Sequence, residues 1–422
     1  MDTDGLIALR RDLHRHPEPA WCEFYTTARI LEELDSRDAS CAVGPDALAG
    51  EKRLAVPDAD ERGRWLERAR AAGADEEVLD RLAGGYTGLV ATLERGAGPT
   101  VALRVDIDAL ARPESADPGH RPVAEGFRSE HEGAMHACGH DAHAAIGVGV
   151  IDAVTASDFT GTLRVFFQPA EEVVGGGAAM AKGGHLEDAD ALLAVHVGLD
   201  HPTGEVVAGV DGFLAVTHLE ATFTGESAHA GGRPEAGRNA IQALGTAIEN
   251  LYGISRHSDG ATRVNVGVVE GGSAANVIAE EAHLVAEVRG ETTELMEYVE
   301  ERARTVLESA AAMHDCALET EVVARAPSAR SDDGLVSLVA DVARAVEGVE
   351  TVLERDELGG SEDATFLMRE VQRHGGLACY VGIGTDHPGG HHTATFDVDE
   401  ESIRHGVEVL AGTIERIGRE RV

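Results

Sequence analysis

Hydrophobic and polar positions alternate along the first half of the chain in blocks that predict buried strands separated by helices. Three short apolar runs, at residues 100–105, 162–167 and 192–195, each end in polar side chains. A helical pattern at residues 141–155 separates the first two runs, which predicts an α/β fold with a mostly parallel sheet. Such sheets carry their chemistry beyond the carboxyl ends of the strands. We therefore expect the polar groups that follow these runs to lie together.

After about residue 212 the pattern changes and predicts a second domain. The expected order is strand, helix, strand, strand, helix, strand, which is the split unit of ferredoxin-like folds. The strands are expected at residues 217–223, 263–269, 282–289 and 317–323, and the helices at 237–252 and 291–313. The predicted domains are residues 1–212, with a helical insert at about 44–87, an inserted domain at 213–325, and a return to the first domain at 326–422.

The charge balance restricts the partners and the solvent of the protein. The 36 basic residues among 422 are outnumbered by 75 acidic ones, which gives a net charge of −39. Nucleic acid and anionic membranes are excluded as partners because both are bound through clustered basic residues. Lysine occurs only at Lys52 and Lys182, and an acidic, lysine-poor surface predicts a halophilic protein whose self-repulsion is screened by salt. Arginine-rich codon usage is the alternative, but it does not explain the surplus of acids.

The cysteines and the apolar runs predict a cytoplasmic protein. Five cysteines are scattered along the chain, a pattern that argues against a disulfide scaffold and for a reducing compartment. The first residues lack the basic and apolar regions of a signal peptide. The longest apolar stretch, at about 144–151, is too short to span a bilayer.

The segment at residues 136–143 is the strongest candidate for a metal site. Its sequence, HACGHDAH, places three histidines, Cys138 and Asp141 within eight positions. Neutral imidazole and thiolate are ligands for transition metals, and Gly139 allows Cys138 and His140 to face one ion. Asp141 is expected to support a metal-bound histidine through a hydrogen bond to its ring. The alternative is a surface histidine loop with an inert cysteine.

Two adjacent carboxylates, Glu171 and Glu172, follow the second apolar run. Pro169 helps to end that strand because proline has no N–H group for the sheet. A metal would stabilise the charge of one carboxylate, so we expect one glutamate to be a ligand and the other a general base. On its own, such a pair is more typical of a solvated surface. Its occurrence together with the cysteine and histidines favours the functional interpretation.

Two further histidine positions extend the candidate metal site. His196 follows the third apolar run, and the tandem His391-His392 is flanked by glycines. Alternatively, His196 is a core residue and the tandem lies in a flexible loop. Together with Cys138, His140 and Glu172 these histidines exceed the needs of one tetrahedral ion. They predict two divalent ions about 3.5–4 Å apart.

The inserted domain has polar candidates of its own. His229 lies in a glycine- and alanine-rich loop, and Asn276 flanks another stretch of small residues. Arg289 ends a predicted strand, where its planar guanidinium would suit a substrate carboxylate. The alternative for Arg289 is an ion pair with a neighbouring acid.

These motifs together resemble the metal-dependent amidohydrolase family that contains auxin-conjugate hydrolases, hippurate hydrolases and N-acyl amino acid deacylases. The similarity covers nearly the whole chain, and the combination of motifs is highly specific although no single motif is. The motifs are residues 13–18, 104–110, 136–143, 168–172, His229, 271–276 and 392–396.

The resemblance implies a zinc-peptidase-like catalytic domain, an inserted dimerisation lid and a set of residue roles. The implied ligands of two divalent ions, zinc or manganese, are Cys138, His140, Glu172, His196 and His392. The implied catalytic residues are the base Glu171, the lid residue His229, which polarises the scissile carbonyl, and Asp108. The implied substrate-binding residues are Asn276, Arg289 and His229.

Within that family the chain resembles the A-subunit type of the aminobenzoyl-glutamate hydrolases. The shared features are the insert at 44–87 and the segments at 120–122, 126–127 and 360–365. The resemblance implies cleavage of p-aminobenzoyl-glutamate to p-aminobenzoate and glutamate, in a homodimer or in a heterodimer with a related B subunit. One alternative is a broad aminoacylase acting on indole-acetyl, benzoyl or acetyl amino acids. The alternative from another class is a catalytically silent binding or regulatory subunit.

Overall fold

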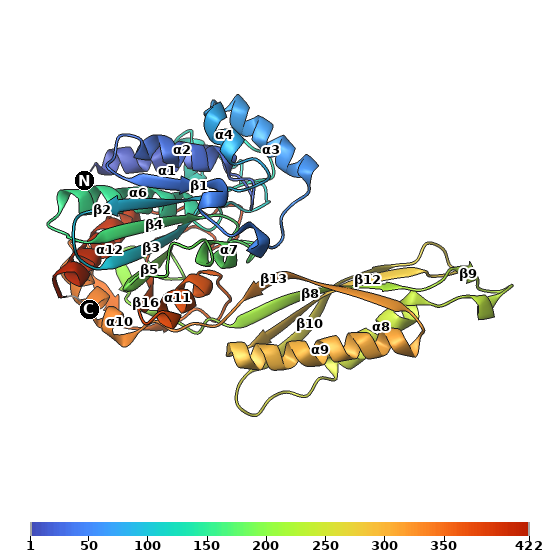
Figure 1. The fold of residues 1–422 in the computed structure, drawn as a ribbon. Helices are drawn as coiled ribbons and strands as arrows, with labels where there is room; N and C mark the ends of the chain where they lie inside the picture. Colours follow the sequence, from blue (N-terminus) through green and yellow to red (C-terminus); the bar gives the residue numbers. More distant parts are fainter. Residues whose placement is uncertain (1, 421–422) are drawn as a thin grey trace. The chain divides into compact units, whose positions relative to one another are not determined.

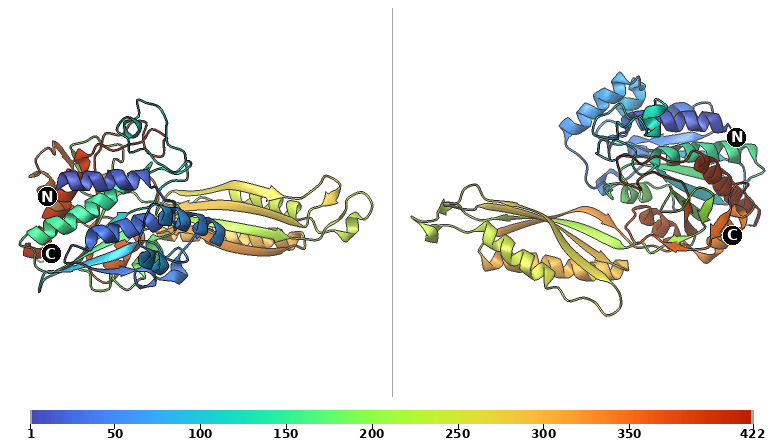
Figure 2. Two further views of the ribbon diagram at one scale, coloured as in Figure 1. Left: turned by 90° about the horizontal axis from the view of Figure 1, so that it is seen from above. Right: turned by 180° about the vertical axis from the view of Figure 1, so that it is seen from behind.

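The computed structural model describes residues 2–420, and the chain divides into two compact units (Figures 1 and 2). The first unit comprises Met1–Gly212, Ala329–Leu358 and Asp363–Val422. The second unit comprises Phe213–Ser328 together with the short segment Gly359–Glu362. Among the described residues, no helix combines the length and the apolar character needed to cross a membrane.

The first unit is built on an eight-stranded sheet in the order β1-β2-β4-β3-β5-β16-β6-β14. Strands β4, β3, β5 and β16 run parallel to one another at its centre, which confirms the predicted α/β class. Antiparallel pairing brings β2 onto β4, β1 onto β2, and β6 onto β16. The strands are β1 (Ser40–Val43), β2 (Leu89–Glu94), β3 (Thr100–Asp106), β4 (Thr162–Gln168), β5 (Ala191–Val197), β6 (Glu205–Val207), β14 (Thr351–Leu353) and β16 (Leu377–Ile383).

Helix α6 (His140–Ala156) is buried over most of its length and carries the start of the candidate site. It packs against α1, α12 and β3. Close packing is possible because two of its positions are glycine: a Cβ at Gly147 would lie 2.8 Å from the Phe167 ring, and one at Gly149 would lie 2.6 Å from Val407. The other helices of the first unit outside its insert are α1 (Thr3–Arg15), α2 (Phe24–Leu34), α5 (Arg121–Ala124), α7 (Gly177–Ala181), α10 (Asp333–Ala343), α11 (Ala364–Arg373) and α12 (Glu401–Glu420).

The segment between β1 and β2 forms a helical insert, seen at the edge of the first unit in Figure 1. Each of its two α-helices is capped by an aspartate: Asp58 accepts a hydrogen bond from the Glu61 N–H, and Asp75 accepts one from the Val78 N–H. Such caps stabilise a helix start by roughly 1 kcal/mol. Trp65 anchors the insert to the core. The elements are η1 (Gly44–Asp46), η2 (Gly50–Lys52), α3 (Ala59–Ala71) and α4 (Glu76–Arg81).

The second unit has the predicted ferredoxin-like order of elements. Its four-stranded sheet, in the order β10-β12-β8-β13, is antiparallel throughout and packs on α8 and α9. The elements are β8 (Ala215–Thr224), α8 (Ala240–Tyr252), β10 (Thr262–Gly271), β12 (Glu281–Gly290), α9 (Thr293–Met313) and β13 (Ala317–Ala326).

Several short elements in both units were not predicted from the sequence patterns. In the second unit these are the ribbon of β9 (Ala228–His229) with β11 (Val277–Ile278) and the helical turn η3 (Pro234–Ala236). In the first unit it is the ribbon of β7 (Val210–Asp211) with β15 (Asp356–Glu357). Two or three residues are too few to show a periodicity.

Candidate metal and catalytic site

The carboxyl ends of three neighbouring strands bring the polar groups of the first unit together. Asp108 follows β3, the pair Glu171-Glu172 follows β4, and His196 lies near the end of β5. Strand β3 lies between β4 and β5, and all three run in the same direction. The expectation that these groups converge is therefore confirmed.

The turn into α6 supplies Cys138 and His140. Gly139 caps the helix with a φ of +92°, in the left-handed region that glycine enters without strain. Space also requires glycine, because a Cβ at this position would lie 2.5 Å from a methyl group of Val197. The turn leaves the Cys138 Sγ atom 3.4 Å from His196 Nε2.

The hydrogen bonds of His140 and His196 place a proton on Nδ1 of each ring, which leaves Nε2 as the nitrogen that can bind a metal. The Nδ1–H group of His196 donates to the Val197 carbonyl at 2.7 Å. The Nδ1–H group of His140 donates to the Asp108 carbonyl at 3.0 Å, with the Asp108 carboxylate 3.2 Å away. A neutral imidazole that donates from Nδ1 keeps a lone pair on Nε2. Support of this kind is typical of metal-bound histidine.

Glu172 is held between two histidines. Its backbone N–H group donates to the Asp108 carboxylate at 3.0 Å. One carboxylate oxygen lies 3.9 Å from His140 Nε2 and the other 3.4 Å from His392 Nε2. Burial raises the pKa of Glu172 to about 8. The negative charges of Asp108 and Asp106 act in the same direction, and the charge of His140 opposes them. A carboxylate in this position requires a cation in order to remain ionised at neutral pH.

The donor atoms fit a pair of divalent cations. Within each of three overlapping triads the donor atoms lie within 4.8 Å of one another. In residues 2–420 neither His140 Nε2 nor Glu172 Oε1 has a hydrogen-bond partner, although both atoms are buried. Buried polar atoms without partners are costly unless a ligand satisfies them. The triads are Cys138-His140-His196, Cys138-Glu172-His392 and His140-Glu171-Glu172.

The tandem histidines His391 and His392 direct their rings toward different groups. His392, with a φ of +58°, directs Nε2 toward Glu172 and belongs to a donor triad. His391 Nε2 accepts a hydrogen bond from the Leu199 N–H at 3.1 Å, so its proton is on Nδ1, 3.5 Å from the Cys138 sulfur. The ring of His391 therefore faces the sulfur with a hydrogen-bond donor, whereas Nε2 of His392 faces the Glu172 carboxylate.

Two other polar residues of the 136–143 motif are engaged elsewhere, although His143 shares one further donor triad with Asp106 and His140. His143 bonds to Asp106 through Nδ1 and accepts the Val197 N–H through Nε2 at 2.8 Å. The expectation that Asp141 supports a metal-bound histidine is wrong, because its side chain pairs with Arg10 and His14. Adjacent side chains on a helix point about 100° apart, so Asp141 turns away from His140. Asp108 provides the support instead, and it contacts His140 and Glu172 as a positioning group.

Two buried carboxylates hold the loop that carries Glu171. Glu23 accepts a hydrogen bond from the Ala170 N–H at 2.8 Å, where Ala170 has a φ of +57°. Asp363 accepts the N–H groups of Gly176 at 3.1 Å and Gly177 at 2.6 Å. The sequence patterns missed both roles. Asp363 lies in the segment 360–365 that carried part of the family resemblance, but nothing in the sequence connects it with the glutamate loop.

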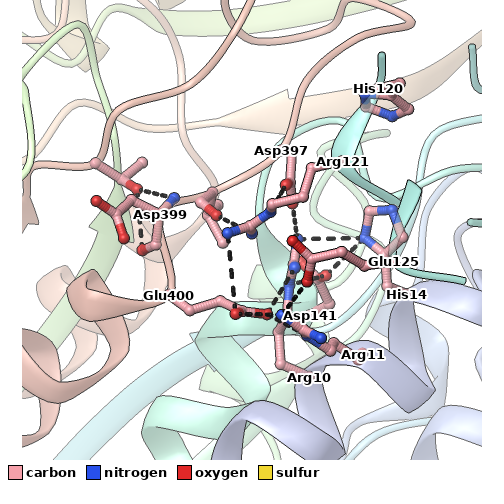
Figure 3. Close-up of polar contacts among 12 residues, drawn as sticks. Arg10, Arg11, His14, His120, Arg121, Glu125, Asp141, Asp397, Asp399 and Glu400 are labelled. Atoms are coloured by element: carbon pink, nitrogen blue, oxygen red, sulfur yellow. Dashed lines mark hydrogen bonds and ion pairs between the residues drawn. The ribbon is translucent and has the colours of Figure 1, made fainter. Parts of the chain in front are cut away.

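A buried ion network anchors the start of α6 to both ends of the chain (Figure 3). Arg10 of α1 pairs with Asp141 of α6 and with Asp397 and Glu400, which precede α12. These carboxylates raise the pKa of Arg10 against the effect of burial. Removing one member of such a network leaves buried charge uncompensated, which costs about 3–5 kcal/mol.

His14 makes this network sensitive to alkaline pH. Burial lowers the pKa of His14, but its bonds to Asp141 at 2.8 Å and Glu114 at 3.0 Å outweigh burial and raise the pKa from 6.5 to about 9. The stabilisation is fully present below the unfolded pKa and is lost as pH rises through the folded pKa. We expect the free energy of unfolding to fall by about 3 kcal/mol between roughly pH 6 and pH 10.

Urea unfolding followed by tryptophan fluorescence measures this loss, because Trp21 and Trp65 both belong to the first unit. His14→Gln should remove most of the slope between pH 6 and pH 10. His185→Gln is the matched control, since its partly exposed ring makes no ion pair in the described part of the chain. An unchanged slope in His14→Gln would contradict the assignment.

The remaining predicted site residues lie in the second unit. His229 is exposed, and its Nδ1 accepts the N–H groups of Gly231 at 3.2 Å and Gly232 at 3.0 Å, which places its proton on Nε2. Arg289 makes two hydrogen bonds to Glu287, at 2.7 and 2.9 Å. The backbone carbonyl of the exposed Asn276 accepts the Ala230 N–H at 3.0 Å. Their roles toward substrate stay predictions.

Comparison with known proteins decides the family. Residues 102–416 match the model of peptidase family M20/M25/M40. The chain belongs to this family. An indole-3-acetyl-aspartic acid hydrolase from Enterobacter agglomerans is 44% identical over 96% of this chain and 94% of the relative. The A-type subunit of the p-aminobenzoyl-glutamate hydrolase from Escherichia coli (strain K12) is 42% identical over the same shares.

Solved structures agree with the assignment to M20/M25/M40. The aminobenzoyl-glutamate utilization protein from Klebsiella pneumoniae matches with a TM-score of 0.83 and 37% identity, over 97% of this chain and 96% of that one. A Bacillus subtilis protein described as a dinuclear metal binding peptidase from the M20 family matches with a TM-score of 0.69 and 25% identity, over 99% and 98%. The predicted family is confirmed, and the chain is a hydrolase that acts on amide bonds.

Proposed function

We propose that this hydrolase cleaves the amide between an aromatic acyl group and an acidic amino acid, with p-aminobenzoyl-glutamate as its substrate. The observation that carries the proposal is the relationship over nearly the full length to two hydrolases named for such conjugates. Indole-3-acetyl-aspartate is the second candidate, because the relative named for it is 44% identical. Both conjugates combine an acyl group that carries an aromatic ring with a dicarboxylic amino acid.

The residue roles follow from the contacts in the first unit. Cys138, His140, Glu172, His196 and His392 would hold two divalent ions, zinc or manganese, since thiolate and imidazole suit zinc and carboxylate also suits manganese. Such ions supply Lewis-acid polarisation of the amide carbonyl and make water more acidic.

The acid–base steps are assigned to residues of this chain. Glu171 would take a proton from the attacking water and deliver it to the leaving amine. It is only partly buried, so water can reach it. Asp108 would keep His140 and Glu172 in place through the contacts that it makes with both. His229 would donate from Nε2–H to the oxygen of the tetrahedral intermediate, a role that fits its protonation on Nε2.

The second unit would provide the dimer interface and the binding groups for the substrate carboxylate. Strand β10 is an edge of its sheet, where Val268 and Val269 are exposed. Exposed apolar side chains on an edge strand favour association. The partner would be a second copy or a related B subunit. Asn276 and Arg289 are assigned to the substrate carboxylate, and the protein is assigned to the cytoplasm of a halophile.

A substrate panel with added zinc or manganese, from low salt to about 3 M salt, tests the function. We expect p-aminobenzoyl-glutamate and indole-3-acetyl-aspartate to be cleaved with a kcat/KM at least about 10-fold above that of N-acetyl and hippuryl conjugates of neutral amino acids. We expect activity to rise with salt, because screening reduces the repulsion between a dianionic substrate and a chain of charge −39.

Other outcomes would select the alternatives. Equal rates on acetyl, benzoyl and indole-acetyl conjugates would favour a broad aminoacylase. Absence of turnover, with fewer than one ion bound per chain, would favour a silent regulatory role. Activity that falls steadily from zero salt would contradict the halophilic assignment.

A further inference from the structure

Arg112 is a cation without a side-chain partner among the described residues. Its guanidinium makes no hydrogen bond or ion pair with any residue of the described range 2–420, and its Nε atom is buried. Acids outnumber basic residues by 75 to 36 in this chain, and arginines such as Arg37 and Arg164 each pair with an aspartate. A partly buried guanidinium left unpaired among so many carboxylates is therefore a candidate for binding an anion from outside the chain.

The loop that carries Arg112 lies beside the candidate metal site. The Ser115 N–H group donates to the Ala394 carbonyl at 2.8 Å, so residues 112–115 run next to the segment that follows His392. On its other side, Leu110 exchanges backbone hydrogen bonds with Met135, at 3.0 and 3.1 Å, and Met135 directly precedes the 136–143 motif. The loop of Arg112 is thus held at both ends by segments that carry predicted metal ligands.

Neighbouring groups do not compete with a ligand for Arg112. Glu114, two residues along, is already bonded to His14 at 3.0 Å and to His120 at 2.9 Å. Its other oxygen accepts the Ser129 N–H at 2.6 Å. By contrast, Arg289 is neutralised by its two bonds to Glu287. Of the two arginines, Arg112 is therefore the better candidate for binding a substrate carboxylate.

We propose that Arg112 binds the side-chain carboxylate of the amino acid part of the substrate, and so selects glutamate and aspartate conjugates over neutral ones. This inference rests on the proposed function, in which the substrate carries two carboxylates. The α-carboxylate is common to every N-acyl amino acid and gives no selectivity among them. A charge-assisted bond from a guanidinium to the second carboxylate does give selectivity, because a neutral amide in its place offers the arginine no negative charge.

Paired substrates that differ only in this group test the proposal. N-Benzoyl-glutamate and N-benzoyl-glutamine are compared on the metal-loaded wild type, Arg112→Gln, Arg112→Lys and the control Arg64→Gln. Arg64 is an exposed arginine of α3 with no ion pair in the described residues, and its change removes the same unit of charge. Arg112→Gln should lower kcat/KM for the glutamate substrate by about 10- to 100-fold, mainly through KM.

The same variant should leave the glutamine substrate within about 2-fold of wild type, Arg112→Lys should recover part of the loss, and Arg64→Gln should change neither substrate. An equal loss on both substrates, or no loss on either, would overturn the proposal. If the wild type cleaves no aromatic conjugate of glutamate or aspartate, the proposed function fails by itself. In that case the role of Arg112 is tested by calorimetry, which compares the binding of glutarate with that of its monoamide. A preference of the wild type for glutarate that Arg112→Gln abolishes supports the role, and equal binding of the two compounds contradicts it.

Discussion

Glu171→Gln should lose about 10²- to 10⁴-fold in kcat while it keeps its fold and its bound metal. The reason is that an amide cannot accept the proton of the attacking water, whereas the other contacts of the site are unchanged. Glu171 and Glu172 are adjacent, but Glu172 faces both His140 and His392. The substitutions Glu171→Gln and Glu172→Gln should therefore have different effects on activity and on metal content.

Three measurements on the same preparations separate these roles. Steady-state rates, metal content by mass spectrometry and thermal unfolding are compared for Glu171→Gln, Glu172→Gln and the control Glu187→Gln, an exposed surface position. Glu172→Gln should lose metal together with activity, and Glu187→Gln should lose neither. Turnover near the wild-type rate in Glu171→Gln would rule out the base assignment. Loss of metal in Glu171→Gln would move that residue into the ligand set.

The sequence was sufficient for those parts of the site that local patterns encode. Three apolar runs that end in polar groups predicted the carboxyl edge of a parallel sheet, and the spacing of Cys138 and His140 around Gly139 predicted a turn facing one site. Both features depend on neighbours in the chain, and the structure confirms the strand arrangement and the turn.

Partners that are distant in sequence were not predictable in this way. Glu23 bonds to Ala170 across 147 positions, and Arg10 pairs with Asp397 across 387. Hydrophobic periodicity reports which face of an element is buried, but it does not report which buried carboxylate accepts which N–H group. The same limit explains the error at Asp141, where proximity in sequence suggested a role that helix geometry gives to Asp108.

The antiparallel edge of the sheet was missed for a related reason. Strands β1 and β2 pair with each other although the helical insert separates them in the chain. β1 has only four residues, and only Val43 among them is fully buried. A strand that short carries too few positions for a period of two to be recognised. Its existence depends on the tertiary pairing with β2.

Cys138→Ala should abolish tight binding of the metal pair, because Cys138 belongs to two of the donor triads at once. The wild-type protein should be stabilised by zinc or manganese, by about 2.7 kcal/mol at a free metal concentration 100 times Kd, which corresponds to a rise in Tm of about 5 °C. Chelation should reverse the rise and leave Glu172 buried beside aspartates without a cation. Cys138→Ala should show little of this stabilisation and at least about 100-fold less activity.

Cys41→Ala is the matched control, since Cys41 is a partly exposed cysteine of β1 outside the donor triads. It should bind metal and respond to chelation as the wild type does. Metal content, Tm with and without added metal, and kcat are measured on all three proteins at fixed high salt. If Cys138→Ala binds two ions per chain with the wild-type affinity, the thiolate is not a ligand. The remaining donors, which are His140, Glu172, His196 and His392, would then have to hold the ions without sulfur. The contact between His391 Nδ1 and the Cys138 sulfur would then have no role in stabilising a metal-bound thiolate.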